Sequence, residues 1–383
     1  MRGEKEQDYL THIWNLTSMM DHPIIAKEED QDEACYRQFY EEAISLCRQK
    51  RFHEVLEKCR YTSLDDEEEY SIDVIQPEKI EFKQNSYEDG ENSIISFPEF
   101  LLLVLDVCTG GEQPASHYQP DKLIEKFDAL KTYFTAGEFY EKMLYYRLLL
   151  DYYTIRRDIK DGQGNYSLIL KGPKDDSDKL KQYQSMLYVS TEAFYNWLKP
   201  YLRKLEQDEL HSCAEMLAFL KKEDNERHSI LPARKDLSYK ASGNIRYWFW
   251  RLDYYLWEQR STFFNEEEQK IVEHYVFRRN RSIEHLHPQD ESHNEEWEEE
   301  AVHSFGNLAM ISQSFNSQQS NDHIQIKFAR IHEQISNKSL QSIKMFLMCK
   351  LADFNYQNWT MKLAKEHENE MIEFLERSFY ISD

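Results

Sequence analysis

Apolar and aromatic side chains recur at helical spacing along most of the 383-residue chain. The segment FYEKMLYYRLLLDYYTIRR, residues 139–157, is typical of this pattern. Helix-breaking residues are scarce, with 10 glycines and 9 prolines, whereas aromatic residues make up 14% of the chain. The pattern therefore predicts a compact, mostly α protein in which aromatic side chains carry much of the core packing.

The length allows two or three domains. We predict an N-terminal helical region with an acidic connection at residues 1–93, a helical domain at 94–205 and a third domain at 206–383. Within the second of these, the turn-rich stretch 160–178 indicates a hairpin-like insertion.

Composition excludes several classes of protein. The longest apolar run, near Phe100–Cys108, is far shorter than the roughly 20 residues of a membrane span, and charges occupy the first residues, where a secretory signal needs an apolar core. Six cysteines without a C-x-x-C pair argue against a zinc ribbon and indicate reduced thiols. We therefore expect a soluble, cytoplasmic protein with no membrane contact.

The formal charge of −23 restricts nucleic-acid binding to local basic clusters, because phosphates must be neutralised by Lys and Arg. Two clusters qualify, at residues 47–60 and 277–281. The first is at helical spacing and is interpreted as a solvated helix face. The second adjoins the residues best suited to chemistry.

The stretch RRNRSIEHLHPQ, residues 278–289, predicts a strand that Pro288 ends. Because side chains alternate along a strand, His285 and His287 should share one face and Glu284 should lie on the other unless a bulge intervenes. His287 is interpreted as a strand neighbour without a ligand role.

A second strand is predicted at residues 301–312, with a tight turn at Gly306–Asn307, and a helix is predicted at 315–335. His303, in the second strand, is also interpreted as a neighbour without a ligand role. The order strand, loop, strand, helix suits a nuclease that uses one metal ion. A carboxylate and an Asn carbonyl are hard ligands for Mg²⁺ or Mn²⁺, and a neutral His beside them can activate water.

IEHLHPQ followed by FGNLAMISQSFNS resembles the HNH (His-Me finger) nuclease motif, and this variant is similar to the nuclease half of GmrSD-type restriction endonucleases. The resemblance extends over helical segments from about residue 94. It implies a mostly α fold with an embedded ββα-metal (HNH) finger at about 280–335. It also implies a metal-dependent DNA endonuclease that hydrolyses phosphodiester bonds in foreign, base-modified DNA as an anti-phage defence.

The resemblance also assigns site residues. It implies that Glu284 and Asn316 hold one Mg²⁺ or Mn²⁺ ion and that His285 is the general base. Asn307 is implied as the brace of the finger, counted among the active-site residues, and Lys327 as a phosphate contact. Three arginines beside the motif are expected to contact the DNA backbone: Arg278, Arg279 and Arg281.

The chain departs from that family in two respects. The Asp-Gly-Gln-Gln-Arg motif of its ParB-like nucleotide-binding half is missing, and so is a Walker motif. We therefore expect either a split system, with a separate ParB-like regulatory subunit, or a truncated chain. The acidic loop 290–300 is interpreted as solvated, with the alternative that it repels phosphate when the partner is absent.

Two other functions remain open on the sequence. RNRSIEH loosely fits the Arg-polar-x(4)-His pattern of HEPN ribonucleases, which cut RNA without metal, with Arg279, Asn280 and His285 as the site. A non-catalytic helical scaffold, with Glu284 and His285 as a hydrogen-bonded surface pair, is the other alternative.

Overall fold

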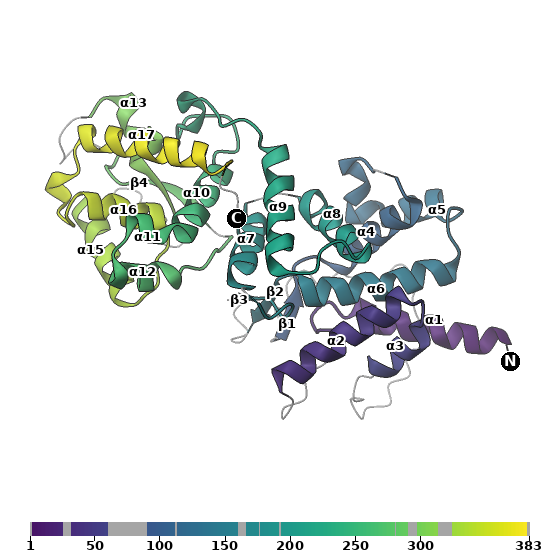
Figure 1. The fold of residues 1–383 in the computed structure, drawn as a ribbon. Helices are drawn as coiled ribbons and strands as arrows, with labels where there is room; N and C mark the ends of the chain where they lie inside the picture. The colour runs from purple at the N-terminus through teal and green to yellow at the C-terminus, as the bar shows by residue number, and fades with distance from the viewer. Residues whose placement is uncertain are drawn as a thin grey trace. The chain divides into compact units, whose positions relative to one another are not determined.

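The fold is mostly α, as the helical spacing predicts (Figure 1). It was obtained as a computed structural model, which describes residues 2–25, 32–59, 90–111, 113–159, 166–175, 177–190, 193–279, 281–289, 297–312 and 324–380. The chain forms two compact units. The first contains residues 1–177 and 194–213, and the second contains residues 178–193 and 214–383.

The first unit is a helical assembly with a small three-stranded antiparallel sheet. Its α-helices are α1 (Arg2–Ser18), α2 (Glu33–Arg48), α3 (Phe52–Lys58), α4 (Phe97–Thr109), α5 (Leu123–Leu130), α6 (Ala136–Tyr153) and α8 (Phe194–Glu206), and its short 3-10 helices are η3 (Ala115–Tyr118) and η4 (Pro120–Lys122). The strands lie in the order β1 (Gly90–Ser93), β2 (Arg156–Ile159) and β3 (Tyr166–Ile169). A hairpin is thus confirmed, but it begins earlier than the insertion predicted at 160–178, because its first strand is Arg156–Ile159.

Helix α4 shows why this part of the chain folds as predicted. Ser96 and Glu99 form a reciprocal capping box at its start, with Pro98 in the first turn. Gly110 ends the helix in the left-handed conformation, at φ 67°, which glycine adopts without steric cost.

The second unit holds the predicted chemistry. Its helices are α7 (Ser177–Val189), α9 (Cys213–Arg227), α10 (Arg246–Glu258), α11 (Arg260–Phe263), α12 (Glu266–Glu273), α13 (Glu299–Val302), α15 (Ile324–Ser336), α16 (Ile343–Leu351) and α17 (Met361–Arg377), and α7 and α9 begin at the boundary with the first unit. Short 3-10 helices are η5 (Arg234–Leu237), η6 (Phe305–Asn307) and η7 (Tyr356–Asn358), and the strands are β4 (Arg281–His285) and β5 (Leu308–Ser312).

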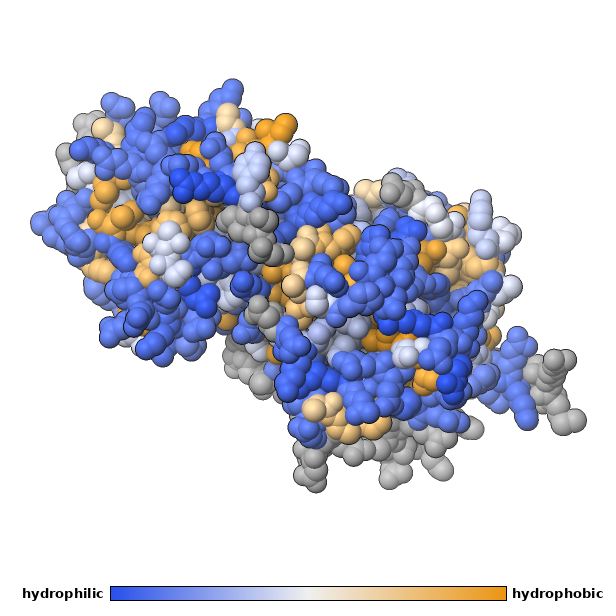
Figure 2. Space-filling view, viewed as in Figure 1, coloured by the Kyte–Doolittle hydropathy of each residue, from blue (hydrophilic) through white to orange (hydrophobic). Residues whose placement is uncertain are grey.

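Helix α10 is the centre of this unit. The helical spacing of Ile245, Trp248, Leu252 and Tyr255 predicts a buried helix, and every side chain from Tyr247 to Trp257 is buried. The reason is that α10 packs against α11, α16, α17 and β5, which leaves it no solvent face. Figure 1 shows α10 and β4 in the interior of the unit, and Figure 2 shows mainly hydrophilic side chains on its visible surface.

A buried polar cluster fixes α7, α9 and α10 to one another. The carboxylate of Asp224 accepts hydrogen bonds from the hydroxyls of Tyr183, at 2.7 Å, and Tyr247, at 2.8 Å. The guanidinium of Arg251 lies 3.3 Å from the same carboxylate. Because both charges are paired and hydrogen-bonded, the cluster can be fully buried.

The hairpin of β4 and β5 differs in one respect from the predicted second strand at 301–312. Strand β5 begins only at Leu308, because Glu299–Val302 form α13 and Phe305–Asn307 form η6. The turn predicted at Gly306–Asn307 is confirmed, but it precedes the strand and does not interrupt it. The predicted helix is described from Ile324 onward, as α15.

Gly306 allows η6 to approach α17 closely. A Cβ atom at this position would lie 2.1 Å from the Ala364 carbonyl oxygen and 2.8 Å from Glu368 Cβ. We therefore expect Gly306→Ala to lower the free energy of unfolding by about 1–3 kcal/mol, because one backbone must move. Denaturant unfolding checks this against Gly243→Ala, where nothing lies within 4 Å of the added Cβ. Equal effects of the two substitutions would show that the close approach is not needed.

Candidate functional site

Glu284 and His285 are the last two residues of β4 and lie beside the start of β5. Glu284 pairs with Ala309 and His285 with Leu308 in a regular antiparallel register. Successive side chains therefore point to opposite faces, as the alternation predicts, with no bulge to bring Glu284 round. Glu284 points toward α15, and His285 points toward the segment that precedes β5.

The Glu284 carboxylate is paired with Lys327 of α15. Lys327 Nζ donates to Glu284 Oε1 and to the His285 carbonyl oxygen, each at 2.5 Å. The side chains of Glu284 and Lys327 are only 9% and 3% exposed. Lys327 therefore balances a buried charge in this structure, and its predicted contact with DNA phosphate stays a prediction.

The imidazole of His285 is buried between two hydrogen-bonding neighbours. Its Nε2 lies 3.0 Å from His303 Nδ1, and its Nδ1 lies 3.0 Å from Gln289 Nε2. The Tyr239 ring packs against it, with ring centroids 4.5 Å apart. Burial lowers the pKa of His285 to about 3, with further lowering from His303 and the positive charge of Lys327. His285 is therefore neutral at neutral pH, which is the state that a general base requires.

The same shift makes a prediction for stability. Because the pKa of His285 is near 3 when folded and about 6.5 when unfolded, the unfolded chain binds the extra proton as the pH falls below 6.5. His285 thus stabilises the fold fully above that pH and progressively less toward pH 3. In EDTA, we expect wild type to lose about 2 kcal/mol more unfolding free energy than His285→Asn between about pH 7 and about pH 4.5. Parallel acid titrations of the two proteins would contradict this.

Asn307 holds the turn before β5 to the end of β4. Its Oδ1 accepts hydrogen bonds from the His287 N–H, at 2.8 Å, and from Trp359 Nε1, at 3.2 Å. Its Nδ2 donates to the carbonyl oxygens of His287, at 3.0 Å, and Val302, at 2.8 Å. The Asn307 side chain that makes these four hydrogen bonds has no solvent exposure. Through these contacts Asn307 holds the turn to the end of β4. A direct role for Asn307 in catalysis stays a prediction.

Lys344 supports the same turn from α16 and was not predicted from the sequence. Its buried Nζ donates to the carbonyl oxygens of Phe305, at 2.9 Å, and Leu308, at 2.7 Å. Burial lowers the pKa of Lys344 to about 7. The two carbonyl groups on either side of Asn307 are therefore satisfied by one side chain, which fixes the start of β5.

The predicted basic residues are placed differently from one another. Arg278 and Arg279 are both exposed. Arg279 also stacks on Tyr188, with its guanidinium carbon 3.9 Å from the ring centroid, and donates to the Tyr188 carbonyl oxygen. Arg279 makes no hydrogen bond with His285, so the structure does not assemble the two into a HEPN pair. Arg281 is described by its backbone pairing in β4 alone.

Other predicted residues lie outside the described part of the chain. These are Asn280, Asn316 and most of the acidic loop, 290–296. Among the residues that are described, no group of three or more His, Cys, Asp and Glu side chains could hold a metal ion. Glu284 is therefore the predicted metal ligand whose position can be examined.

His303 and Tyr239 are the neighbours of His285 that sequence reasoning missed. His303 was interpreted as a strand neighbour without a ligand role, but it lies between α13 and η6 and hydrogen-bonds His285. Tyr239 follows η5, and its ring is 43% exposed. The sequence could have indicated His303, because a histidine close to the motif is a possible partner for His285. It gave no indication of Tyr239, which comes from a distant segment of the chain.

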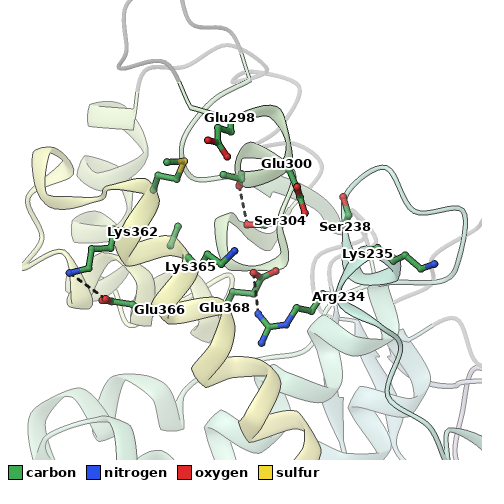
Figure 3. Close-up of a pocket in the computed structure, with 13 residues that line it drawn as sticks. Arg234, Lys235, Ser238, Glu298, Glu300, Ser304, Lys362, Lys365, Glu366 and Glu368 are labelled. Carbon is green, nitrogen blue, oxygen red and sulfur yellow. Dashed lines mark hydrogen bonds and ion pairs between the residues drawn. The ribbon is translucent and has the colours of Figure 1, made fainter.

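A cavity of about 460 Å³ lies between η5, α13 and α17. Figure 3 shows Ser238 and Ser304, the sequence neighbours of Tyr239 and His303, among the labelled side chains of its lining. Its charged lining is evenly balanced between bases and acids: Arg234, Lys235, Lys362 and Lys365 against Glu298, Glu300, Glu366 and Glu368. Such a balance does not favour a polyanion as the ligand of this cavity.

A buried acid–His pair on a hairpin followed by a helix defines a candidate hydrolytic centre. Residues 222–374 match the family model of GmrSD restriction endonucleases, C-terminal domain. Over these residues the chain is similar to the C-terminal domain of GmrSD restriction endonucleases, which confirms the resemblance seen in the sequence.

The match lies within the second unit and contains β4, β5 and α15. No curated protein and no solved structure matches the chain. No helix in the described ranges is long and apolar enough to cross a membrane.

Proposed function

We propose that the protein is a metal-dependent DNA endonuclease of the HNH type, which cuts foreign and base-modified DNA in anti-phage defence in the cytoplasm. The observation that carries the proposal is the position of Glu284 and His285. They end a strand that pairs with β5 and contacts α15, inside the segment matched by the restriction endonuclease domain. An acid and a neutral imidazole are thereby held on one short piece of rigid backbone.

The donor set fits a hard divalent cation. Glu284 offers carboxylate oxygens that already lie against a cation, the ammonium of Lys327, and Asn316 would add an amide oxygen. Mg²⁺ is commonly held by one or two carboxylates, with the remaining positions filled by water and substrate phosphate. When bound, Mg²⁺ or Mn²⁺ would stabilise the charge that develops on the scissile phosphate.

His285 supplies the base. Its neutral imidazole takes a proton from the attacking water while the water oxygen bonds to phosphorus and the leaving oxygen departs from it. Burial lowers the pKa of the imidazole in the protein without DNA or metal. The negative charge of a phosphodiester bound beside it would favour the protonated form.

DNA contact and regulation complete the proposal. Arg278, Arg279 and Arg281 are neighbours in the sequence and would provide local positive charge on a chain whose formal charge is −23, and Lys327 would add a phosphate contact. A separate ParB-like nucleotide-binding subunit is the proposed regulatory partner. Neutralising the acids at 290–300 would then raise DNA affinity in the absence of that partner.

Plasmid DNA, modified phage DNA and structured RNA, each incubated with Mg²⁺, Mn²⁺ or EDTA, test the function. We expect cleavage of DNA that requires the metal ion and is absent in EDTA. Cleavage of RNA that survives EDTA would overturn the proposal in favour of a metal-independent ribonuclease. Co-purification identifies the partner, and full activity of a monodisperse protein alone would contradict the split system.

A further inference from the structure

We propose that His303 is the positioning residue of His285: it holds the imidazole in the tautomer whose free lone pair is on Nδ1, so that Nδ1 takes the proton from water. The inference rests on the proposed function. It concerns a residue that the sequence pattern left without a role, and it follows from three sets of contacts around His285.

The first set is the chain of hydrogen bonds through the two rings. Gln289 Nε2 donates toward His285 Nδ1 at 3.0 Å, so Nδ1 acts as the acceptor. A neutral imidazole that accepts at Nδ1 carries its proton on Nε2. His285 Nε2 then donates to His303 Nδ1, also at 3.0 Å, and His303 in turn carries its proton on Nε2.

The second set fixes His303 itself. Its carbonyl oxygen accepts hydrogen bonds from the Tyr239 N–H and the Ser238 hydroxyl, both at 3.0 Å. The Tyr239 ring is stacked on the His303 ring, with an interplanar angle of 15°, and meets the His285 ring at 62°. Backbone and ring are thus both held, so the acceptor that faces His285 keeps its orientation.

The third set gives the direction from which water arrives. Gln289 is exposed, whereas His303 is only 8% exposed. Replacing the Gln289 amide by a water molecule gives that water access to Nδ1, whereas Nε2 is already occupied by its hydrogen bond to His303. Proton transfer to Nδ1 produces an imidazolium whose Nε2–H still donates to His303, and this hydrogen bond stabilises the new charge.

Three substitutions at position 303 separate positioning from packing. His303→Asn places an amide oxygen where Nδ1 stands, His303→Gln displaces that oxygen by one bond, and His303→Leu removes it. We expect His303→Leu and His303→Gln to lower kcat about 10- to 100-fold with KM little changed, and His303→Asn to restore most of the loss. His274→Ala, at an exposed histidine after α12, is the matched control.

The tautomer of His285 can be measured directly by NMR, in the absence of DNA cleavage. Long-range ¹H–¹⁵N spectra of the ¹⁵N-histidine-labelled full chain should show His285 protonated at Nε2 in wild type and His303→Asn, and a mixture of tautomers in His303→Leu. Protonation at Nδ1 in wild type, or an unchanged kcat in His303→Leu, would overturn the inference. Thermal unfolding identifies a variant that fails to fold, in which case His303→Gln decides.

The two levels of the proposal fail in different ways. Absence of metal-dependent DNA cleavage by wild type would refute the proposed function. DNA cleavage by His285→Ala at the wild-type rate would refute the role of His285 as the base and the positioning role with it. Loss of cleavage in His285→Ala together with full cleavage in all three variants at position 303 would refute the positioning role alone.

Discussion

His285→Ala is expected to lower kcat for DNA cleavage on the order of 10²- to 10⁴-fold, the range by which a positioned general base accelerates a reaction. The imidazole is neutral because of its burial and is oriented by His303 and Gln289. Removing it leaves the attacking water without a proton acceptor, while Glu284 and Lys327 on the other face of β4 keep their contacts. Cleavage should therefore fail although the divalent cation is still bound.

The measurement is single-turnover cleavage of supercoiled DNA in Mg²⁺, with cation binding followed separately by calorimetry. His274→Ala is the control, because its exposed imidazole lies outside the site and should leave the rate unchanged. A rate for His285→Ala within a few-fold of wild type would assign the base to another residue. A variant that is inactive only because it unfolds would show a large drop in melting temperature.

The fold was predictable where local sequence decides the structure. Helix α4 carries its own start and stop in Ser96, Glu99 and Gly110, and these signals act over a few residues. The alternation of side chains along β4 is likewise enough to predict that Glu284 and His285 lie on opposite faces, without any tertiary contact. The surroundings of α10 could not be predicted in this way, because its complete burial depends on α16, α17 and β5, which lie far from it in the sequence.

The neighbours of the site were beyond local signals for the same reason. Lys327 meets Glu284 only because α15 packs across β4 at one particular register, which no periodicity specifies. Tyr239 and His303 meet His285 because Ser238 and Tyr239 hydrogen-bond to the His303 backbone. The sequence could name the acid and the base from their chemistry, but their partners depended on long-range packing.

Lys327→Ala is expected to lower the free energy of unfolding in EDTA by about 3–5 kcal/mol, because it leaves the Glu284 carboxylate buried without its cation. The two side chains are 3% and 9% exposed. Chemical denaturation measures the loss. The matched control is Lys362→Ala, since Lys362 pairs with Glu366 at 3.6 Å in solvent, where the two side chains are 86% and 58% exposed. That substitution should have little effect because exposed ion pairs contribute little.

The same variant tests whether Glu284 binds the metal ion. In Lys327→Ala the carboxylate is free to accept another cation, so saturating Mg²⁺ or Mn²⁺ should restore part of the lost stability and should stabilise this variant more than wild type. In the double variant Lys327→Met with Glu284→Gln, no buried charge is left, and both the loss and the rescue should be smaller. Rescue of the double variant to the same extent would place the cation elsewhere, whereas rescue confined to Lys327→Ala would mean that Lys327 and the metal ion neutralise the same carboxylate.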